Sequence, residues 1–119
     1  MAIKIKLART PKEIDDALWL RHEVFVIEDG KFGGKPLHGS RMVDRFDAFP
    51  SVFHVIAYEG PEPIATMRLV KDSSAGLPAD ELYDFARFRG RAHLETKEPV
   101  FGSAGMLAIR EKWRRRRDV

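Results

Sequence analysis

The chain has 119 residues, of which 33% are charged and 44% hydrophobic, and its formal net charge is +3; this is the size and composition of one globular domain. That length excludes a second full-size domain, and the absence of cysteine excludes disulfides, thiolate zinc sites and cysteine nucleophiles. No apolar run approaches the roughly 18 residues of a membrane span, and the N-terminus alternates lysine with aliphatic residues, unlike a signal peptide, so we predict a cytoplasmic protein.

Two elements are predicted at the N-terminus: an edge strand over residues 2–8 and a helix from about Pro11 to about Glu28. In the strand, aliphatic residues alternate with lysines, which is typical of a strand with one wet face. The helix begins with a capping box, because Thr10 and Glu13 can each accept a hydrogen bond from the backbone N–H of the other. Its apolar stripe includes one charged residue and consists of Ile14, Ala17, Leu18, Arg21, Val24 and Phe25.

Residues 30–51 form a long connection with four glycines and two prolines and with neither helical nor strand periodicity. Connections of this length in a small domain are usually functional or disordered. A disordered tract would contain fewer large apolar residues, so we predict a packed loop that covers the functional site. Its predicted apolar anchors are Phe32, Leu37, Met42, Val43, Phe46 and Phe49.

A β-hairpin is predicted next. Residues 52–58 are almost continuously apolar, which is typical of a central strand covered on both faces, and a Gly-Pro-Glu-Pro turn joins them to a second run at 64–70. A short helical segment is predicted near residues 78–88. A third apolar run at 100–109 is rich in small residues, which indicates a bulge or a close approach of the backbone to a ligand. We expect this strand to continue the sheet of the hairpin and a helix to begin at Arg110.

Four charged residues lie beside apolar ones. Arg21 lies in the helix stripe, Arg68 in the second hairpin strand, and Asp44 and Asp47 close the long loop. A buried guanidinium needs an anion close by, so we predict that the four converge on one cleft. The spacing alone leaves two interpretations open: a structural ion-pair network, or a site that orients a polar substrate. His54, in an apolar strand, is interpreted as a core histidine and kept as a reserve candidate for a base.

The positive charge is concentrated at the C-terminus. Residues 110–119 include six basic and two acidic side chains and carry +4, whereas the rest of the chain carries −1. Such a segment binds phosphate, an acidic protein or nucleic acid, or is simply a solvated helix face. Trp113 is the one aromatic residue among the arginines, which argues against a platform for nucleic acid.

Three sequence blocks carry a resemblance to a known family. They are Leu20–Val26 (LRHEVFV), Asp44–Asp47 (DRFD) and Ala65–Leu69 (ATMRL), in this order and spacing. Over about residues 12–119 the chain resembles the GNAT acyltransferase superfamily, and within it the N-acyl amino acid synthases and the acyl-homoserine-lactone autoinducer synthases. The resemblance implies an α/β fold with a mostly antiparallel sheet and flanking helices, truncated after the fourth strand. Residues 1–119 would then be the N-terminal portion of a single GNAT-like domain.

The resemblance also implies a function, which is transfer of a fatty acyl group from a thioester on acyl carrier protein or coenzyme A to the amine of an amino acid or a related small molecule. We expect no metal and no permanently bound cofactor. The residues that would bind the acceptor are Arg21, Phe25, Asp44, Asp47 and Arg68. The candidate bases for the amine are Glu95 and Glu98. The donor would lie along the backbone of Met106, Leu107, Ala108 and Ile109, with its phosphate near Arg114, Arg115, Arg116 and Arg117.

Two features depart from the family pattern. Residues 114–119 lack the glycines of the family's phosphate-binding turn, so arginine side chains would hold the phosphopantetheine or the acidic surface of a carrier protein, which favours that donor over coenzyme A. The chain also stops where its last helix has barely begun, so either it is a fragment or another chain, such as a second copy in a homodimer, completes the sheet. The alternative function is a non-catalytic binding module, whose basic tail recruits an acidic protein or nucleic acid and whose inner charges are structural.

Overall fold

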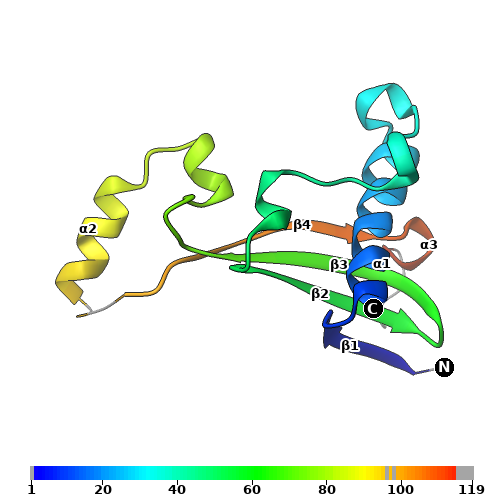
Figure 1. Cartoon of the computed structure of the whole chain (residues 1–119), viewed down its shortest axis with the longest axis horizontal. Helices are drawn as coiled ribbons and strands as arrows, with labels where there is room; N and C mark the ends of the chain where they lie inside the picture. The colour runs from blue at the N-terminus through cyan, green and yellow to red at the C-terminus, as the bar shows by residue number, and fades with distance from the viewer. Residues whose placement is uncertain (1, 96, 98, 115–119) are drawn as a thin grey trace.

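The computed structural model describes residues 2–95, 97 and 99–114. Its four strands form one antiparallel sheet in the order β1-β2-β3-β4, which confirms the predicted α/β fold with a mostly antiparallel sheet and flanking helices (Figure 1). The strands are β1 (Ile3–Leu7), β2 (Val52–Glu59), β3 (Glu62–Lys71) and β4 (Gly102–Ile109). The helices are α1 (Pro11–Arg21), α2 (Ala86–Glu95) and α3 (Glu111–Arg114), with shorter helical segments η1 (His22–Glu28), η2 (Lys31–Gly34), η3 (His38–Ser40), η4 (Arg45–Ala48) and η5 (Pro78–Glu81).

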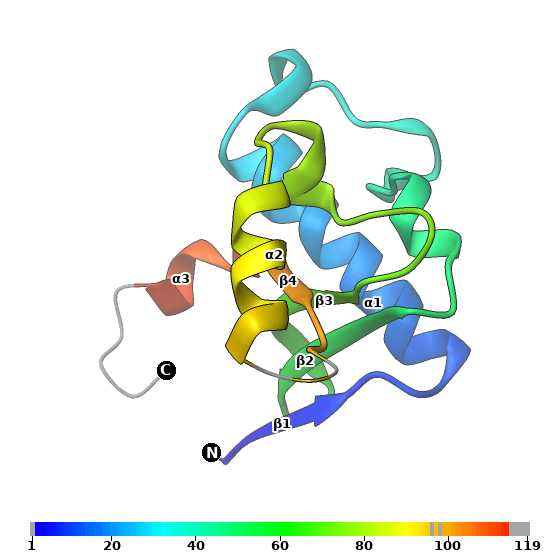
Figure 2. The ribbon, with the colours of Figure 1, turned by 90° about the vertical axis from the view of Figure 1, so that its left-hand side faces the viewer.

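Helix α1 packs on one face of the sheet, and α2 lies at the opposite end of the long axis of the molecule (Figures 1 and 2). Ala17 and Leu20 of α1 form a fully buried cluster with Ile56 of β2. The alternation predicted for β3 is confirmed, because one row is buried and the other is half-buried. The buried row contains two polar side chains among its members Ile64, Thr66, Arg68 and Val70.

Helix α1 begins at the predicted capping box. Thr10 Oγ1 accepts a hydrogen bond from the Glu13 N–H at 3.2 Å, and Glu13 Oε1 accepts one from the Thr10 N–H at 3.1 Å. Two backbone donors that a helix start leaves without intrahelical partners are therefore satisfied by side chains. The cap fixes the direction in which α1 enters the fold, and with it the position of Arg21 at the other end of the helix.

Replacing Thr10 by alanine should lower the free energy of unfolding by about 1 kcal/mol, because the Glu13 N–H loses its acceptor. Urea denaturation followed by circular dichroism measures the change. Ser74 is exposed, and its side chain makes no hydrogen bond within the described part of the chain, so Ser74→Ala is the control. The control should change stability by less than about 0.5 kcal/mol. Equal denaturation midpoints for the two variants would contradict a stabilising role of the cap.

Beyond Arg21 the helix continues as the wider π-helix η1. The Asp29 N–H donates to the Val24 carbonyl, five residues back, at 2.9 Å. The helix ends before Gly30, whose φ of 77° lies in the left-handed region that glycine adopts readily. The predicted extent to Glu28 is therefore confirmed. The prediction that the buried residues of this segment follow regular α-helical spacing is wrong, because Phe25 is only half-buried while His22, Val24 and Val26 are buried.

The sheet is covered differently from the prediction. Strand β2 was expected to be buried on both faces, but its side chains alternate, with His54 and Ile56 buried and Phe53 45% exposed. On β1, Ile5 is 72% exposed although its aliphatic row was expected to be the dry one. The prediction of a doubly covered β2 is wrong for the described residues, because α1 covers one face and leaves the other open.

The long loop and the second helix also differ in part from their predictions. The loop is packed at Phe46, which is buried against Val70 and Leu77, but the predicted anchors Phe32 and Val43 are more than 60% exposed. The helix predicted near residues 78–88 is wrong in position, because 78–81 form only the short turn η5 and α2 starts at Ala86. The Asp84 carboxylate accepts a hydrogen bond from the Ala86 N–H at 2.9 Å and forms an Asx turn directly before this later start.

Candidate functional site

Arg21, the last residue of α1, is the centre of a buried ion-pair cluster. Its side chain is fully buried and holds both carboxylate oxygens of Asp47, with Nη1 donating to Oδ2 at 2.8 Å and Nη2 to Oδ1 at 2.7 Å. Nη1 also donates to the Met42 carbonyl at 3.3 Å. The paired, parallel hydrogen bonds are the strong and directional form of carboxylate recognition by arginine. They fasten the long loop to the end of α1.

Arg68 of β3 reaches the same carboxylate from the sheet. Its Nη1 donates to Asp44 Oδ1 at 2.6 Å and to Asp47 Oδ1 at 3.3 Å. Turn η4 presents both acids, because Asp44 accepts a hydrogen bond from the Phe46 N–H and Asp47 accepts one from the Asp44 N–H. The Arg68 side chain is 4% exposed and the Asp44 side chain 35%. Asp44 is therefore the member of the cluster that reaches solvent.

The electrostatics of the cluster follow from this geometry. Burial alone would raise the pKa of Asp47, but hydrogen bonds from Arg21 and the Asp44 N–H, together with the charges of Arg21 and Arg68, outweigh burial and hold that pKa at about 2. His54 Nδ1 lies 3.2 Å from Arg21 Nη2, which can only donate, so Nδ1 accepts and the proton is assigned to Nε2. Burial, and then the charge of Arg21, lower the pKa of His54. These contacts fit the interpretation of His54 as a core histidine.

The predicted convergence of Arg21, Asp44, Asp47 and Arg68 is confirmed: their charged groups meet through ion pairs. With His54 they form what we call the charge cluster. Two acids balance the charge of two arginines, while the buried Nε atoms of Arg21 and Arg68 have no hydrogen-bond partner among the described residues. The role of the cluster in acceptor binding stays a prediction. The fifth residue predicted to bind the acceptor, Phe25, lies further along in η1, with the Lys31 ammonium 5.0 Å from its ring centroid.

Strand β4 is an edge of the sheet in the described residues, and it is bulged beside the charge cluster. Thr66 pairs with Ala108 but Arg68 pairs with Gly105, so β4 carries one extra residue between these pairs. Met106, in the bulge, has a φ of 52°, a backbone conformation that residues other than glycine rarely adopt. The other residues predicted to contact the donor vary in exposure: Leu107 is 59% exposed, Ala108 buried and Ile109 half-buried.

Glu28, the last residue of η1, is the residue that sequence reasoning missed. Its carboxylate accepts hydrogen bonds from Arg110 Nε at 2.9 Å, from the Glu111 N–H at 3.1 Å and from Arg114 Nη2 at 3.4 Å. These partners lie 82 to 86 residues away, so no local pattern signals the contact. Arg114, predicted to hold the phosphate of the donor, is thus held by an acid of its own chain. Arg115, Arg116 and Arg117 lie outside the described residues.

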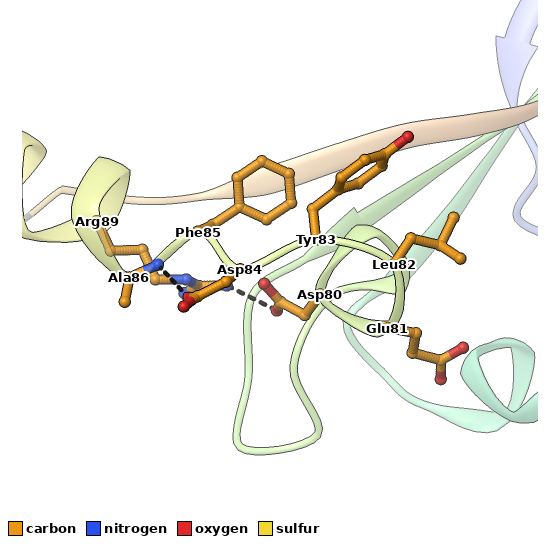
Figure 3. Close-up of a pocket in the computed structure, with 8 residues that line it drawn as sticks. All are labelled: Asp80, Glu81, Leu82, Tyr83, Asp84, Phe85, Ala86 and Arg89. Carbon is orange, nitrogen blue, oxygen red and sulfur yellow. Dashed lines mark hydrogen bonds and ion pairs between the residues drawn. The ribbon is translucent and has the colours of Figure 1, made fainter.

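The structure does not bring Glu95, one of the two predicted bases, to the charge cluster. Glu95 is exposed at the end of α2, at the far end of the molecule from α1, and Glu98 lies outside the described residues (Figure 1). Beside α2 lies an open hollow of about 510 Å³, lined by residues 80–86 and Arg89 (Figure 3). Its acids are largely committed, because Arg89 pairs with Asp80 and Arg45 pairs with Glu81.

Two classes of feature are missing from the residues that the structure describes. No three or more histidine, aspartate or glutamate side chains among residues 2–95, 97 and 99–114 gather in a way that could hold a metal ion. Within the same ranges, no helix has the length and apolar character that crossing a membrane requires.

The fold is shared with a solved acyltransferase. The chain matches the structure of FeeM, an N-acyl amino acid synthase from uncultured soil microbes, with a TM-score of 0.68 and 17% sequence identity. The match covers 99% of this chain and 57% of that chain, so this chain spans little more than half the length of FeeM. A comparison with curated proteins found no match.

A family sequence profile adds the more specific result. The profile described as N-acyl amino acid synthase FeeM matches residues 16–119, which is most of the chain. The chain therefore belongs to the FeeM family of N-acyl amino acid synthases. This confirms the resemblance to N-acyl amino acid synthases that the three sequence blocks indicated.

Proposed function

We propose that the chain is part of an N-acyltransferase that moves a fatty acyl group from a thioester to the amine of an amino acid or a related small molecule. Membership of the FeeM family supports the reaction type. One geometric observation supports the proposal: Arg68, a member of the charge cluster, pairs with Gly105 of β4, next to the bulge at Met106. The charge cluster, which can bind polar groups, thus lies on the strand next to β4, whose outer edge pairs with no other strand among the described residues. The proposal includes a cytoplasmic location.

The donor thioester is proposed to lie along the outer edge of β4. At the two ends of this strand the Arg110 N–H donates to the Ile64 carbonyl and the Asp72 N–H to the Phe101 carbonyl. Inward and outward backbone groups alternate along an antiparallel strand, so Ile109, between the inward positions Ala108 and Arg110, directs its N–H away from β3. An outward N–H can donate to the thioester oxygen as it becomes negative during attack. Small residues in β4 leave room for the pantetheine arm.

The acceptor is proposed to bind beside the charge cluster, through Asp44. Its half-open carboxylate is the cluster group that an incoming ammonium can reach. A base first takes one proton from the ammonium, and the neutral amine then attacks the thioester carbonyl. A C–N bond forms and the C–S bond breaks; the nitrogen loses a second proton, and the thiolate takes up a proton and leaves as a thiol. Of the two predicted bases, Glu98 remains the proposed one, because Glu95 lies at the far end of the molecule from α1. The open edge of β4 calls for completion by a further segment or by a second copy of the chain.

Turnover tests the proposal directly. The chain would be incubated with fatty acyl thioesters of acyl carrier protein, of coenzyme A and of N-acetylcysteamine, each with a panel of amino acids, and the products identified by mass spectrometry. N-acyl amino acids that depend on the protein are expected. Asp44→Asn should raise the KM for the amino acid more than it lowers kcat, whereas Asp15→Asn, which removes the charge of an exposed carboxylate paired with Arg41, is the control. Absence of any acylated amine would overturn the proposal.

The basic tail supplies a second prediction. Reversing Arg115 and Arg116 to glutamate should weaken binding of acyl carrier protein at least tenfold, or about 1.4 kcal/mol, with a smaller effect at high salt. Each lost charge-assisted contact to phosphate or carboxylate is worth about 1.5–3 kcal/mol. Surface plasmon resonance at two salt concentrations measures the change. Unchanged carrier binding together with lost affinity for duplex DNA would favour the alternative, a non-catalytic module that binds nucleic acid.

A further inference from the structure

His22, the first residue of η1, is a buried histidine whose two ring nitrogens both make hydrogen bonds. Its side chain is 1% exposed. Nε2 lies 3.0 Å from the backbone nitrogen of Leu37 in the long loop, and Nδ1 lies 3.0 Å from Glu23 Oε2. A backbone N–H can only donate, so Nε2 accepts, and the ring proton is assigned to Nδ1, which donates to Glu23. This arrangement requires a neutral ring, because both nitrogens of a charged imidazole are donors.

The two halves of the long loop are held by contacts that respond differently to pH. Residues 41–48 are held beside α1 by two ion pairs, which are Arg41 with Asp15 and Arg21 with Asp47. Arginine stays charged, and an ordinary aspartate stays ionised above about pH 5. The earlier half is tied to the start of η1 by the hydrogen bond of Leu37 with His22, beyond the end of α1 (Figure 1). A histidine ordinarily changes its charge between about pH 5 and pH 8, so this contact depends on pH near neutrality, whereas the two ion pairs do not.

We propose that His22 is a proton-controlled latch of the long loop: the neutral ring holds residues 30–40 against η1, and the protonated ring releases them. Protonation makes Nε2 a donor that faces a second donor, the Leu37 N–H, so the hydrogen bond is lost. The ring is buried, so the new N–H group reaches water only when the loop moves away. The latch requires no substrate and does not depend on the proposed acyl transfer.

The charged groups near His22 determine which side of the contact moves. Glu23, on η1 itself, accepts a hydrogen bond from Nδ1 in either state of the ring, so this contact survives protonation. Hydrogen bonds to Asp15 of α1 and, more weakly, the charge of Glu23 raise the pKa of Arg41 in the loop. Glu23 therefore has a cation of the loop nearby, and that cation is held by α1. The ring keeps its place on η1, and the segment before Arg41 moves.

Amide hydrogen exchange of the full chain, read residue by residue by NMR, tests the latch. Between about pH 7.5 and about pH 5.5 the Leu37 amide should lose about tenfold in protection, after correction for the intrinsic pH dependence of exchange. The Met42 amide, which donates to the Leu18 carbonyl at 3.3 Å, is the internal control and should keep its protection. Nitrogen chemical shifts should show Nε2 of His22 without a proton at the higher pH. Equal protection of Leu37 at both pH values, or a proton on Nε2 at the higher pH, would overturn the proposal.

Two substitutions assign the effect to His22. His22→Gln keeps a side-chain acceptor for the Leu37 N–H but takes up no proton in this range, so the protection of Leu37 should be the same at both pH values. His38→Gln replaces an exposed histidine next to Leu37 and should keep the pH dependence of the wild type. If His22→Gln fails to fold, the wild type still decides, because the loss of protection must follow the titration of the His22 ring. A loss that follows His38 or His54 instead would contradict the latch.

Discussion

Asp47→Ala should lower the free energy of unfolding by about 3–5 kcal/mol, because it leaves two buried guanidinium groups without their shared partner. Arg21 loses both of its ion-pairing hydrogen bonds, while Arg68 keeps Asp44. A small domain is stable by only about 5–15 kcal/mol, so the variant should be close to unfolding at room temperature. Urea denaturation followed by circular dichroism measures the loss. A loss of binding or turnover in this variant would reflect unfolding as well as any role of Asp47 in the reaction.

The matched control for Asp47 is Asp15, which pairs just as well but at the surface. Arg41 Nε donates to Asp15 Oδ1 at 2.7 Å, yet the two side chains are 34% and 53% exposed. Asp15→Ala should therefore cost about 0–1 kcal/mol. Losses of equal size in the two variants would show that burial of the charge cluster does not set its contribution. A double variant, Arg21→Met with Asp47→Leu, should recover part of the loss if unpaired charge is its cause.

The pKa of Asp47 adds a pH signature to the same residue. Its pKa in the folded chain is about 2, below the ordinary aspartate value of 3.8, so ionised Asp47 stabilises the fold. The contribution is complete above about pH 4 and is lost as the pH falls toward 2. The wild type should therefore lose about 2 kcal/mol over this window through Asp47 alone, and Asp47→Asn should lack that part of the acid transition. Thermal unfolding between pH 5 and pH 2 compares the two chains.

Much of the sheet was predictable because its signals are local. Alternation in β3, the Gly-Pro turn and the capping box at Thr10 each depend on a few neighbouring residues, and each is confirmed. The convergence of Arg21 with the two aspartates was also predictable, because an apolar surface cannot hold an unpaired charge. In each of these cases the residues that determine the feature can be identified from the sequence alone.

The features that were missed depend on distant partners. Glu28 reads as the end of a helix, and only the folded chain brings it to Arg110 and the start of α3. The exposure of Ile5 and Phe53 was missed for a related reason. The alternation in a strand shows which side chains are apolar, but whether they are buried depends on elements that are distant in the sequence. The π-helical turn of η1 has no known local signature in this segment, so the buried positions of His22 and Val26 were not anticipated.

Trp113→Ala is expected to lower the free energy of unfolding by about 3–5 kcal/mol, which is the cost of removing a large aromatic side chain from a packed core. Trp113 is 1% exposed and is the largest of the fully buried side chains. It anchors α3, so its loss should also loosen the contacts of Glu28 with Arg110 and Glu111. Urea denaturation followed by the fluorescence of the remaining Trp19 measures stability.

Trp113→Phe keeps most of the buried volume and is the control, with an expected loss of less than about 1.5 kcal/mol. An alanine variant as stable as the wild type would show that α3 is not part of the folded domain. The ion pairs of Glu28 with Arg110 and Arg114 would then not be needed to hold α3 against η1. A large loss for alanine and a small one for phenylalanine would instead show that the side chain of Trp113 holds α3, which follows the proposed donor edge of β4, to the core.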